Sequence, residues 1–330
     1  MNLGFRVDAS KDIGYGHWSR CLNLSRILKS NKTYFFSKFY VNSLKDSKIN
    51  LVKLKKKKSK KLELSELKKK ILINKIDILI IDNYEFDYDL QKKIKKYVKK
   101  LIIIDDYVNK KYFCDIYLNY SFLESKEKKN LKKKNLRLAI GTKYLPLDKK
   151  FYSLRKKKRI RKNIKNILIF FGGINKTYLI FRLLKLCKYF ENLKFYFVLG
   201  EANKKKIYRF FKNQKNIKLF SGIKNKKMAS LIHNCDLAIG SGGVNLYERI
   251  FLGLPSIVLR TSLNQKRNII ISKRKKLIIH INNSSSSFNI IKKKILYLIK
   301  YKKIHEKISK NCYSSINGNQ KKYLNKLIKL

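Results

Sequence analysis

A short loop near the start of the sequence, Gly14-Tyr15-Gly16-His17-Trp18-Ser19-Arg20, combines residue types that can bind an anion and move a proton. It stands between a predicted strand at 3–8 and a helix that we expect to begin near His17. Gly14 and Gly16 lack a Cβ, so the backbone can approach a bulky ligand closely, and the N–H groups at a helix start favour a phosphate. Histidine is the side chain best suited to accept a proton at neutral pH. We interpret the loop as a ligand site with His17 as a catalytic base; a helix-capping histidine is the alternative.

Two further glycine-rich turns follow apolar runs in the second half of the chain. One is Gly172-Gly173, and the other is the turn at 240–243, which contains Gly242 and Gly243. A glycine-rich turn at a helix start suits a diphosphate. Glu248 lies about one turn along the helix that follows, where its carboxylate can accept hydrogen bonds from a ribose diol. Pairing of Glu248 with a surface lysine is the alternative.

Short apolar strands that alternate with helices must position these turns. We expect strands at 3–8, 33–36, 51–52, 77–82, 101–104, 114–118, 167–171, 195–199, 217–220, 236–239 and 256–259. We expect helices at 62–75, 86–99, 176–190, 228–232 and 244–252, with another beginning at Asn264-Gln265. This alternation is typical of βαβ units in doubly wound parallel sheets, where ligands bind at the carboxyl ends of the strands.

The chain of 330 residues is long enough for two domains of ordinary size. We place a first Rossmann-like domain, with the histidine loop, at 1–148 and a second, nucleotide-binding one at 164–330. The stretch 149–163 is strongly basic and has no clear period, so we predict an interdomain linker there. The expected fold class is α/β.

Two acidic clusters follow predicted strands, Asp82-Asn83-Tyr84 and Asp105-Asp106-Tyr107. Adjacent carboxylates could in principle hold a metal or act as acid and base. Neighbouring side chains on an extended segment point to opposite sides, however, which disfavours a shared metal. We therefore expect a structural role for Asp105 and Asp106.

The net charge of +60 invites a nucleic-acid interpretation. Only 13 of the 81 basic residues are arginine, the residue preferred for bidentate phosphate and base recognition, and 68 are lysine. Lysine accompanies isoleucine and asparagine throughout, which indicates compositional drift in an AT-rich genome. We expect no specific nucleic-acid partner, and weak nonspecific binding at low salt.

The five cysteines are scattered and form no Cys-x-x-Cys pair, as in reduced cytoplasmic proteins. No apolar run approaches the roughly 18 residues of a membrane helix, and the N-terminus runs straight into a strand without the apolar region of a signal peptide. His233, His280 and His305 have no ligand-like spacing, so we expect no metal site. We expect a cytoplasmic monomer without a cofactor.

Several of these motifs resemble the PseG family, UDP-sugar hydrolases of pseudaminic acid synthesis that are related in fold to MurG-type glycosyltransferases. The opening Asp8-Ala9-Ser10, followed by residues 13–17 and Arg20, is similar to the start of that family. Phe171-Gly172-Gly173 and the block 228–259 are similar to its nucleotide-binding half. The resemblance covers nearly the whole chain, although the lysine-rich middle matches poorly. It implies two Rossmann-like domains facing across a cleft, the GT-B fold.

The resemblance also implies roles for individual residues. His17 would be the base, with Tyr84 and Asn264 orienting water and sugar; an ordinary helix N-cap is the alternative for Asn264. Glu248 would hold the ribose, and the backbone near Ile223 would receive uracil. The implied substrate-binding set is Gly14, Gly16, Arg20, Gly172, Gly173, Ile223, Gly242, Gly243, Glu248 and Gln265. Val244 departs from the pattern, because those families often have Ser or Thr there.

The implied reaction is attack of water at C1 of a UDP-linked 2,4-diacetamido-2,4,6-trideoxy sugar, a precursor of a bacterial surface glycan. It releases UDP and the free sugar with inversion and requires no metal. One alternative is a GT-B glycosyltransferase in which His17 deprotonates an acceptor hydroxyl. The other is a basic nucleic-acid-binding protein.

Overall fold

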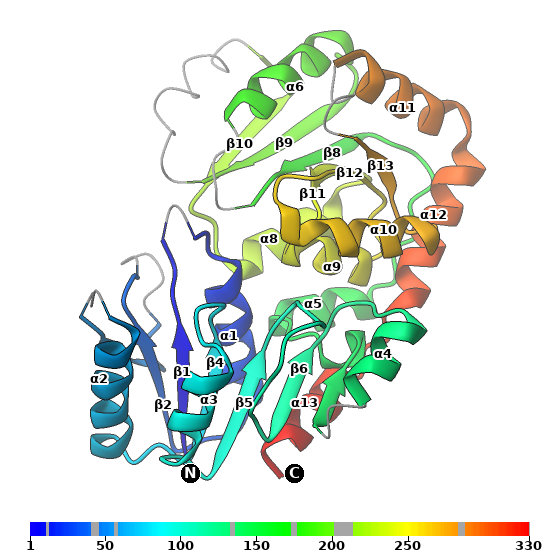
Figure 1. Cartoon of the computed structure of the whole chain (residues 1–330). Helices are drawn as coiled ribbons and strands as arrows, with labels where there is room; N and C mark the ends of the chain where they lie inside the picture. Colours follow the sequence, from blue (N-terminus) through cyan, green and yellow to red (C-terminus); the bar gives the residue numbers. More distant parts are fainter. Residues whose placement is uncertain are drawn as a thin grey trace. The chain divides into compact units, whose positions relative to one another are not determined.

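The computed structural model describes residues 1–10, 13–40, 46–55, 59–132, 136–172, 177–200, 214–282 and 288–329. The chain divides into two compact units, each built on its own parallel sheet (Figure 1). Unit 1 comprises Met1–Pro146 and Asn319–Leu330, and unit 2 comprises Leu147–Gly318. The α/β class and the two Rossmann-like sheets agree with the prediction.

Unit 1 contains a seven-stranded sheet in the order β3-β2-β1-β4-β5-β6-β7, and all its strand pairs are parallel. Its strands are β1 Asn2–Val7, β2 Lys32–Ser37, β3 Asn50–Lys53, β4 Ile78–Asp82, β5 Lys100–Ile104, β6 Ile116–Asn119 and β7 Arg137–Ile140. The strand order reverses between β1 and β4. In sheets of this kind, ligands bind beside the carboxyl ends of the strands at that point.

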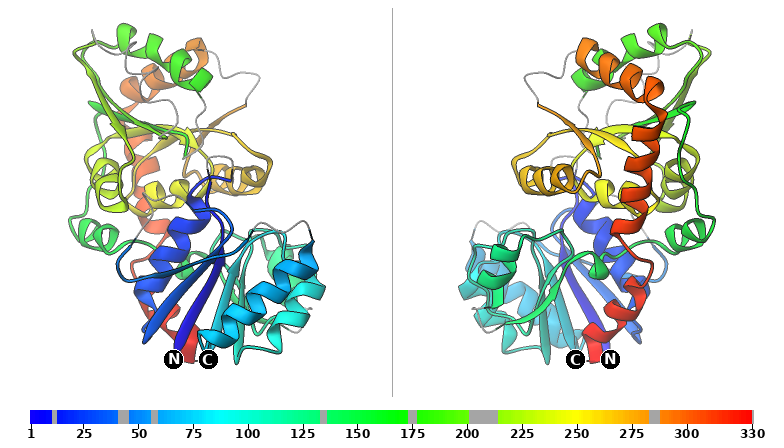
Figure 2. Two further views of the ribbon diagram at one scale, coloured as in Figure 1. Left: turned by 90° about the vertical axis from the view of Figure 1, so that its left-hand side faces the viewer. Right: turned by 90° about the vertical axis from the view of Figure 1, so that its right-hand side faces the viewer.

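Helices cover both faces of this sheet (Figure 2). The bounds are α1 Gly16–Ile27, α2 Lys60–Ile73, α3 Tyr88–Lys95, α4 Ser125–Lys132 and α13 Gln320–Lys329, with a 3-10 turn η2 at Thr142–Tyr144. One core cluster joins alternate residues of β1, such as Phe5, to Trp18 of α1 and Leu324 of α13. The other joins Leu79 of β4 to Leu67 of α2. Alternate strand residues therefore serve opposite faces, as in a pleated strand.

Unit 2 contains a six-stranded parallel sheet in the order β10-β9-β8-β11-β12-β13. Its strands are β8 Asn166–Phe170, β9 Lys194–Leu199, β10 Ile217–Ser221, β11 Leu237–Ser241, β12 Ser256–Leu259 and β13 Ile279–Ile281. Its helices are α5 Lys149–Lys156, α6 Thr177–Tyr189, α8 Asn225–Asn234, α9 Val244–Phe251, α10 Lys266–Arg274, α11 Phe288–Lys300 and α12 Lys302–Ser315, with a 3-10 turn η4 at Leu263–Gln265. The order reverses between β8 and β11, so the two glycine-rich turns of this unit follow the strands at the switch point.

The stretch 149–163, expected to be a linker, belongs to unit 2 and begins with α5. Arginine side chains of this stretch bind carbonyl groups where helices end. Arg161 donates to the carbonyls of Ile232, His233 and Leu252, and Arg155 donates to that of Tyr313 at 2.7 Å. Cations at helix C-termini satisfy the last carbonyls and oppose the helix dipole. Composition shows the basic residues but not these partners, which explains the difference from the prediction.

The last helix also differs from the predicted division. The sequence assigned 164–330 to the second domain, whereas α13 packs in unit 1. Leu324 and Leu327 lie fully within the core cluster of that unit, and the Lys100 ammonium donates to the Ile328 carbonyl at 3.2 Å. A short amphipathic helix carries no local signal of which sheet it covers.

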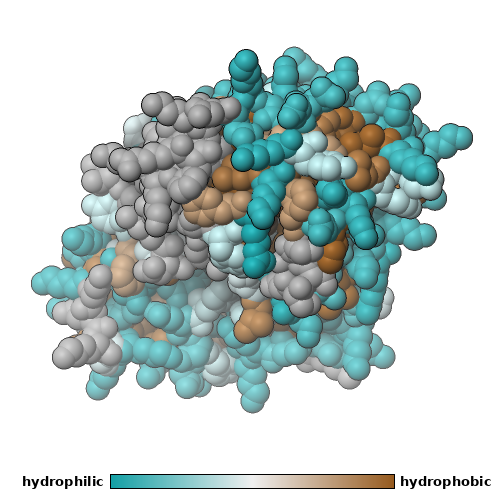
Figure 3. Space-filling view, turned by 90° about the horizontal axis from the view of Figure 1, so that it is seen from above, coloured by the Kyte–Doolittle hydropathy of each residue, from teal (hydrophilic) through white to brown (hydrophobic). Residues whose placement is uncertain are grey.

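The lysines account for most of the positive charge, and none is among the buried residues of the described part of the chain. Figure 3 shows long hydrophilic side chains over much of one face, with hydrophobic residues between them. The arginines behave differently, because Arg6, Arg20, Arg161 and Arg249 are fully buried. The charge is therefore mostly solvated lysine. Within the described ranges, no helix is both long and apolar enough to cross a membrane.

Substitution of Gly240 by alanine is expected to lower the free energy of unfolding by about 1–3 kcal/mol, as overpacking does. A Cβ there would overlap the carbonyl oxygen of Phe170, which lies opposite on β8. Thermal unfolding measures the change. Gly318→Ala is the control, since its Cβ would lie 3.8 Å from Arg155 Nε in ordinary contact. Equal melting temperatures for the two variants would contradict the prediction.

Candidate functional site

His17 lies at the start of α1 and contacts the end of β4 rather than capping the helix. The N-cap residue is Tyr15, and no side chain caps this helix end. The Nδ1 atom of His17 lies 2.7 Å from Oδ1 of Asp82, and 18% of the histidine side chain is exposed. Asp82 is the last residue of β4, at the point where the strand order reverses. We assign the proton to Nδ1, which donates to the carboxylate and leaves Nε2 able to accept a proton.

Gly14 and Gly16 shape the turn that precedes this helix. Gly14 adopts a positive φ of 85°, which favours glycine. Its N–H donates to the Ser10 carbonyl at 2.9 Å. Gly16 is the first residue of α1. The glycines thus allow the tight turn that presents His17.

Arg20 follows His17 by about one turn of α1 and binds two carboxylates, those of Asp82 and Asp106. Its side chain is 1% exposed, and it donates to both carboxylate oxygens of Asp82. Its Nη1 atom lies 3.2 Å from Asp106 Oδ2 and donates to the Tyr120 hydroxyl at 2.8 Å. The resemblance implied that Arg20 touches the substrate. In this structure its donors are directed at protein groups, and besides Asp82 and Asp106 they include His17, whose Nδ1 atom lies 2.9 Å from Arg20 Nη2. A direct contact of Arg20 with substrate stays a prediction.

Tyr84 joins the same cluster through Asp106. Its hydroxyl donates to Asp106 Oδ2 at 2.8 Å, and its ring meets that of His17 edge-on with the centroids 5.0 Å apart. Asp105, in contrast, accepts from the Tyr107 N–H at 2.9 Å and pairs with Lys110. The two adjacent carboxylates therefore have separate partners, as expected from an extended segment. The contact of Asp106 with a candidate site residue was not predicted from the sequence.

The charges of this cluster hold its acids ionised and its tyrosine neutral. Burial would raise the pKa of Asp82, but the Arg20 guanidinium and His17 outweigh it and hold that pKa well below its ordinary value. The pKa of Asp106 is likewise lowered, because Arg20 outweighs the effect of burial. Burial and the charge of Asp106 raise the pKa of Tyr84. At neutral pH the Tyr84 hydroxyl therefore donates to Asp106 and keeps a lone pair for a ligand.

The second cluster surrounds the N-terminus of α9 in unit 2. Gly243 is the N-cap residue, no side chain caps the helix, and its first turn contains no acidic residue. Such an end favours an anion. A Cβ on Gly242 would lie 2.5 Å from Ile269 Cγ1, so the turn requires glycine there. Val244, where related families often have a hydroxyl, is the first residue of α9.

Gln265 holds this turn in place. Its Oε1 atom accepts hydrogen bonds from the N–H groups of Gly242 and Thr261, each at 3.1 Å. The amide thus ties the turn before α9 to the segment that follows β12. Asn264 is exposed in η4, and its Oδ1 accepts from the Ser262 hydroxyl at 2.6 Å. Asn264 is not the cap of α10, because the N-cap residue of that helix is Gln265.

Glu248 is buried on α9, with 7% of its surface exposed. It accepts a hydrogen bond from Nδ2 of Asn245 at 2.5 Å, and no lysine among the described residues pairs with it. Burial raises its pKa from 4.5 to about 7, although Asn245 and Arg249 oppose the rise, and Asp148 adds to it. Asn245 is not among the site residues predicted from the sequence. Its position three residues before Glu248 on the same helix face was the available signal.

Ile223 and Gly172 lie in other loops of unit 2. Ile223 is partly buried between β10 and α8. Gly172 follows β8 with a positive φ of 96°, and nothing lies within 4 Å of the position of a Cβ there. Gly173 lies outside the described residues. The structure therefore brings Gly242, Gly243, Gln265 and Glu248 together around α9.

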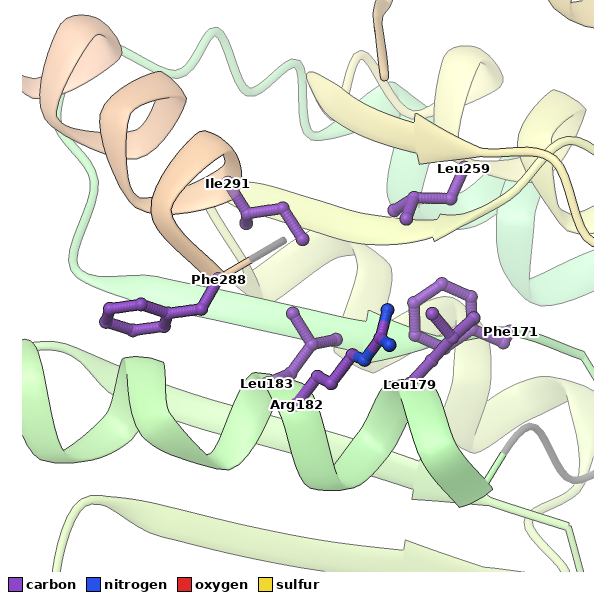
Figure 4. Close-up of a pocket in the computed structure, with 7 residues that line it drawn as sticks. All are labelled: Phe171, Leu179, Arg182, Leu183, Leu259, Phe288 and Ile291. Atoms are coloured by element: carbon purple, nitrogen blue, oxygen red, sulfur yellow. The ribbon is translucent and has the colours of Figure 1, made fainter. Parts of the chain in front are cut away.

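An apolar hollow lies near the ends of β8 and β12, between α6 and α11 (Figure 4). It has an empty volume of about 220 Å³, part of it open solvent. Its lining residues are Phe171, Leu179, Arg182, Leu183, Leu259, Phe288 and Ile291. Figure 4 shows the Arg182 guanidinium among apolar side chains. This lining suits packing rather than proton transfer. Among the residues that the structure describes, no three His, Cys, Asp or Glu residues are grouped to hold a metal ion.

Comparison with curated proteins identifies distant relatives, while no protein-family model matches the chain. An uncharacterised protein of Methanocaldococcus jannaschii is 31% identical over 274 residues, covering 78% of this chain and 55% of that protein. The chain thus spans about half the length of this relative. The spore coat polysaccharide biosynthesis protein SpsG of Bacillus subtilis is 28% identical, with 78% of this chain and 77% of SpsG covered. The UDP-2,4-diacetamido-2,4,6-trideoxy-beta-L-altropyranose hydrolase of Campylobacter jejuni is 27% identical, with coverages of 76% and 89%.

Solved structures share the fold over the whole chain at low sequence identity. MurG of Acinetobacter baumannii matches with a TM-score of 0.67 and 11% identity, covering 99% of both chains. The UDP-GlcNAc 2-epimerase of Neisseria meningitidis, bound to UDP-GlcNAc, matches with a TM-score of 0.65 and 14% identity, covering 100% of both chains. The chain therefore has the GT-B fold of MurG and the UDP-GlcNAc 2-epimerases and is a distant homologue of SpsG and the Campylobacter hydrolase.

Proposed function

We propose that this protein is a metal-independent UDP-sugar hydrolase of the PseG kind, acting on a UDP-linked 2,4-diacetamido-2,4,6-trideoxy sugar. The observation that carries the proposal is the His17–Asp82 pair, 2.7 Å apart at the switch point of the sheet in unit 1. A histidine oriented by a buried carboxylate is the usual design of a general base. The distant homology to the Campylobacter hydrolase supports the choice of substrate.

In the proposed reaction, Nε2 of His17 takes a proton from water while the oxygen attacks C1 of the sugar. The bond between C1 and the diphosphate oxygen breaks, and UDP leaves with the bonding electrons. Asp82 stabilises the imidazolium that forms. Tyr84 and Asn264 orient water and sugar. Attack opposite the leaving group inverts the configuration at C1.

The nucleotide part of the substrate is assigned to unit 2. The N–H groups at the start of α9 and the positive end of its dipole stabilise the diphosphate as its charge grows. Glu248, held by Asn245, accepts hydrogen bonds from the ribose diol. The loop at Ile223 receives uracil, and Gly172 borders the diphosphate. We thus assign the catalytic base to unit 1 and the nucleotide site to unit 2.

A GT-B glycosyltransferase is the second candidate, supported by the likeness to MurG. The same histidine would then deprotonate an acceptor hydroxyl instead of water. Specific nucleic-acid binding has less support, because most of the exposed positive charge is lysine and several arginines are buried.

The deciding experiment incubates the protein with UDP-2,4-diacetamido-2,4,6-trideoxy-β-L-altropyranose and follows UDP and the freed sugar by ³¹P and ¹H NMR. We expect stoichiometric UDP and sugar, an inverted anomer as the first product, and no loss of rate in EDTA. UDP-GlcNAc serves as the control for sugar specificity. Tight UDP binding without release would favour a transferase or another sugar. Absence of both binding and release would refute the proposal.

The affinity for UDP is expected to rise by about tenfold between pH 6 and pH 8, as a group with a pKa of about 7 becomes ionised. The ionised Glu248 carboxylate accepts both ribose hydroxyls, whereas its protonated form has lost acceptor capacity. Isothermal titration calorimetry across this range measures the change. Glu248→Gln is the control. In this variant the phosphate groups of UDP still titrate, but the carboxyl group of residue 248 is absent. Equal slopes for both proteins would contradict the assignment.

The same pKa shift makes a prediction for stability without ligand. Since burial raises the pKa of Glu248, the folded state prefers the neutral acid. Its contribution is fully present below pH 4.5 and is lost as the pH rises through about 7. Glu248→Gln should therefore stabilise the empty protein at pH 8 more than at pH 5 in thermal unfolding.

A further inference from the structure

Arg249 is a buried cation that directly follows Glu248 in the sequence. It is 1% exposed and belongs to α9. Its side chain runs back toward the start of the helix, where Nε donates to the Asn245 carbonyl at 3.3 Å and Nη2 donates to the Ser241 carbonyl at 2.5 Å. Nη1 is buried and has no hydrogen-bond partner within the described part of the chain. The guanidinium therefore lies against the turn 240–243.

Arg161, another buried arginine of unit 2, provides the contrast. Its Nε donates to the Cys235 carbonyl, and its Nη1 and Nη2 atoms each donate to two further carbonyls. An unpaired donor on a buried cation is costly, and proteins rarely retain one without a partner. Burial lowers the pKa of Arg249 to about 10, so the group remains charged at neutral pH.

The position of Arg249 indicates what that partner is. A Cβ built on Gly240 would lie 3.1 Å from Nη1, which places this donor at the end of β11. The adjacent helix end has no acidic residue in its first turn and no side-chain cap. A cation and a helix N-terminus at the same turn both favour an anion. Glu248, the neighbouring carboxyl group, is already bonded to Asn245.

We propose that Arg249 is a positioning residue for the diphosphate of a nucleoside diphosphate. Its hydrogen bond to the Ser241 carbonyl fixes the turn, so that the N–H groups at the start of α9 face the ligand, and its charge next to the turn strengthens binding of the diphosphate. This inference rests on the proposed function for the identity of the ligand, but it does not depend on hydrolysis. Its specific consequence is that Arg249 contributes to the affinity for UDP far more than to that for uridine.

The test compares UDP with uridine by calorimetry or NMR titration in Arg249→Met and Arg249→Gln. We expect UDP affinity to fall about tenfold or more, as for loss of a charged hydrogen-bonding group. Uridine affinity should change less than about twofold. Arg249→Gln keeps a donor for the Ser241 carbonyl, so it provides an uncharged variant if Arg249→Met fails to fold. Arg249→Lys should restore much of the UDP affinity.

Arg161→Gln is the matched control. It removes a buried arginine of the same unit whose partners are carbonyls away from the turn, so it should lower the melting temperature without changing the ratio of UDP to uridine affinity. The pH dependence gives a second readout. Because Arg249 lowers the pKa of Glu248 while Asp148 raises it, the midpoint of UDP binding should move above pH 7 in Arg249→Gln.

Two failures can be told apart. A wild-type protein that does not bind UDP would refute the proposed function together with this inference. Wild-type UDP binding with an unchanged ratio in Arg249→Gln, or an equal loss for UDP and uridine, would overturn this inference alone.

Discussion

Replacing His17 by alanine is expected to lower kcat by about 10²- to 10⁴-fold, the usual contribution of a general base. The variant loses the imidazole of this cluster. Nδ1 of that ring is bonded to Asp82, and Nε2 has no hydrogen-bond partner among the residues that the structure describes. UDP affinity should stay within about twofold, since the proposed nucleotide site belongs to unit 2. Initial rates of UDP release and calorimetry with UDP measure the two quantities.

His233→Ala is the matched control for this experiment. His233 is partly exposed on α8 in unit 2 and lies outside both clusters. We expect its removal to leave kcat unchanged. If His17→Ala retained more than about a tenth of wild-type kcat, His17 would not be the base. Loss of UDP affinity alongside kcat would indicate a folding defect instead, which circular dichroism would reveal.

The second large effect is expected for Asp82→Asn, which should reduce both activity and stability. The amide of asparagine has one accepting oxygen instead of two, so it cannot accept hydrogen bonds from Arg20 at both positions. It also lacks the negative charge that binds the Nδ1 proton of His17. Breaking a buried ion pair costs about 3–5 kcal/mol when a partner charge remains, and Asp106 compensates only part of this because its contact with Arg20 is longer, at 3.2 Å. The rate should fall by about a thousandfold or more, as in other oriented-histidine sites.

Asp77→Asn is the control at the opposite end of β4. Asp77 accepts from the N–H of Asn2 at 2.8 Å and pairs with the exposed Lys99, so its amide keeps one contact and loses a weak surface pair. We expect a change within about 0.5 kcal/mol and normal kcat. Comparable losses of activity in both variants would show that Asp82 has no special role.

Acid unfolding gives a further check of Asp82. Its pKa lies well below the ordinary value of 3.8, because Arg20 and His17 outweigh the effect of burial. The contribution of this carboxylate to stability is therefore present above about pH 4 and is lost as the pH falls below it. The wild-type stability curve should drop more steeply in this range than that of Asp82→Asn. Parallel curves would mean that the carboxylate is not stabilised by its partners.

Local patterns in the sequence determined the class of fold. Runs such as 77–82 and 101–104 are almost wholly apolar, as strands buried on both faces of a sheet must be. Their alternation with helices leads to parallel sheets, and the loops at Gly14, His17 and Gly242 could be placed at strand ends because glycine permits a tight turn before a helix. Each of these patterns extends over only a few residues, so it can be recognised even in a chain rich in lysine.

Contacts between distant residues were decided only by the tertiary structure. His17 and Asp82 are 65 positions apart, and Arg20 and Tyr120 are 100 apart. They meet because parallel pairing brings the carboxyl ends of β4, β5 and β6 to one edge of the sheet. No periodicity in the sequence contains that information. For the same reason the sequence did not show that Arg161 binds the last carbonyls of α8 and α9, or that α13 joins unit 1. Nor did it show that one donor of Arg249, Nη1, is buried without a partner among the described residues. Composition and period determine which elements form, whereas the partner of each polar side chain depends on which distant elements the fold brings next to it.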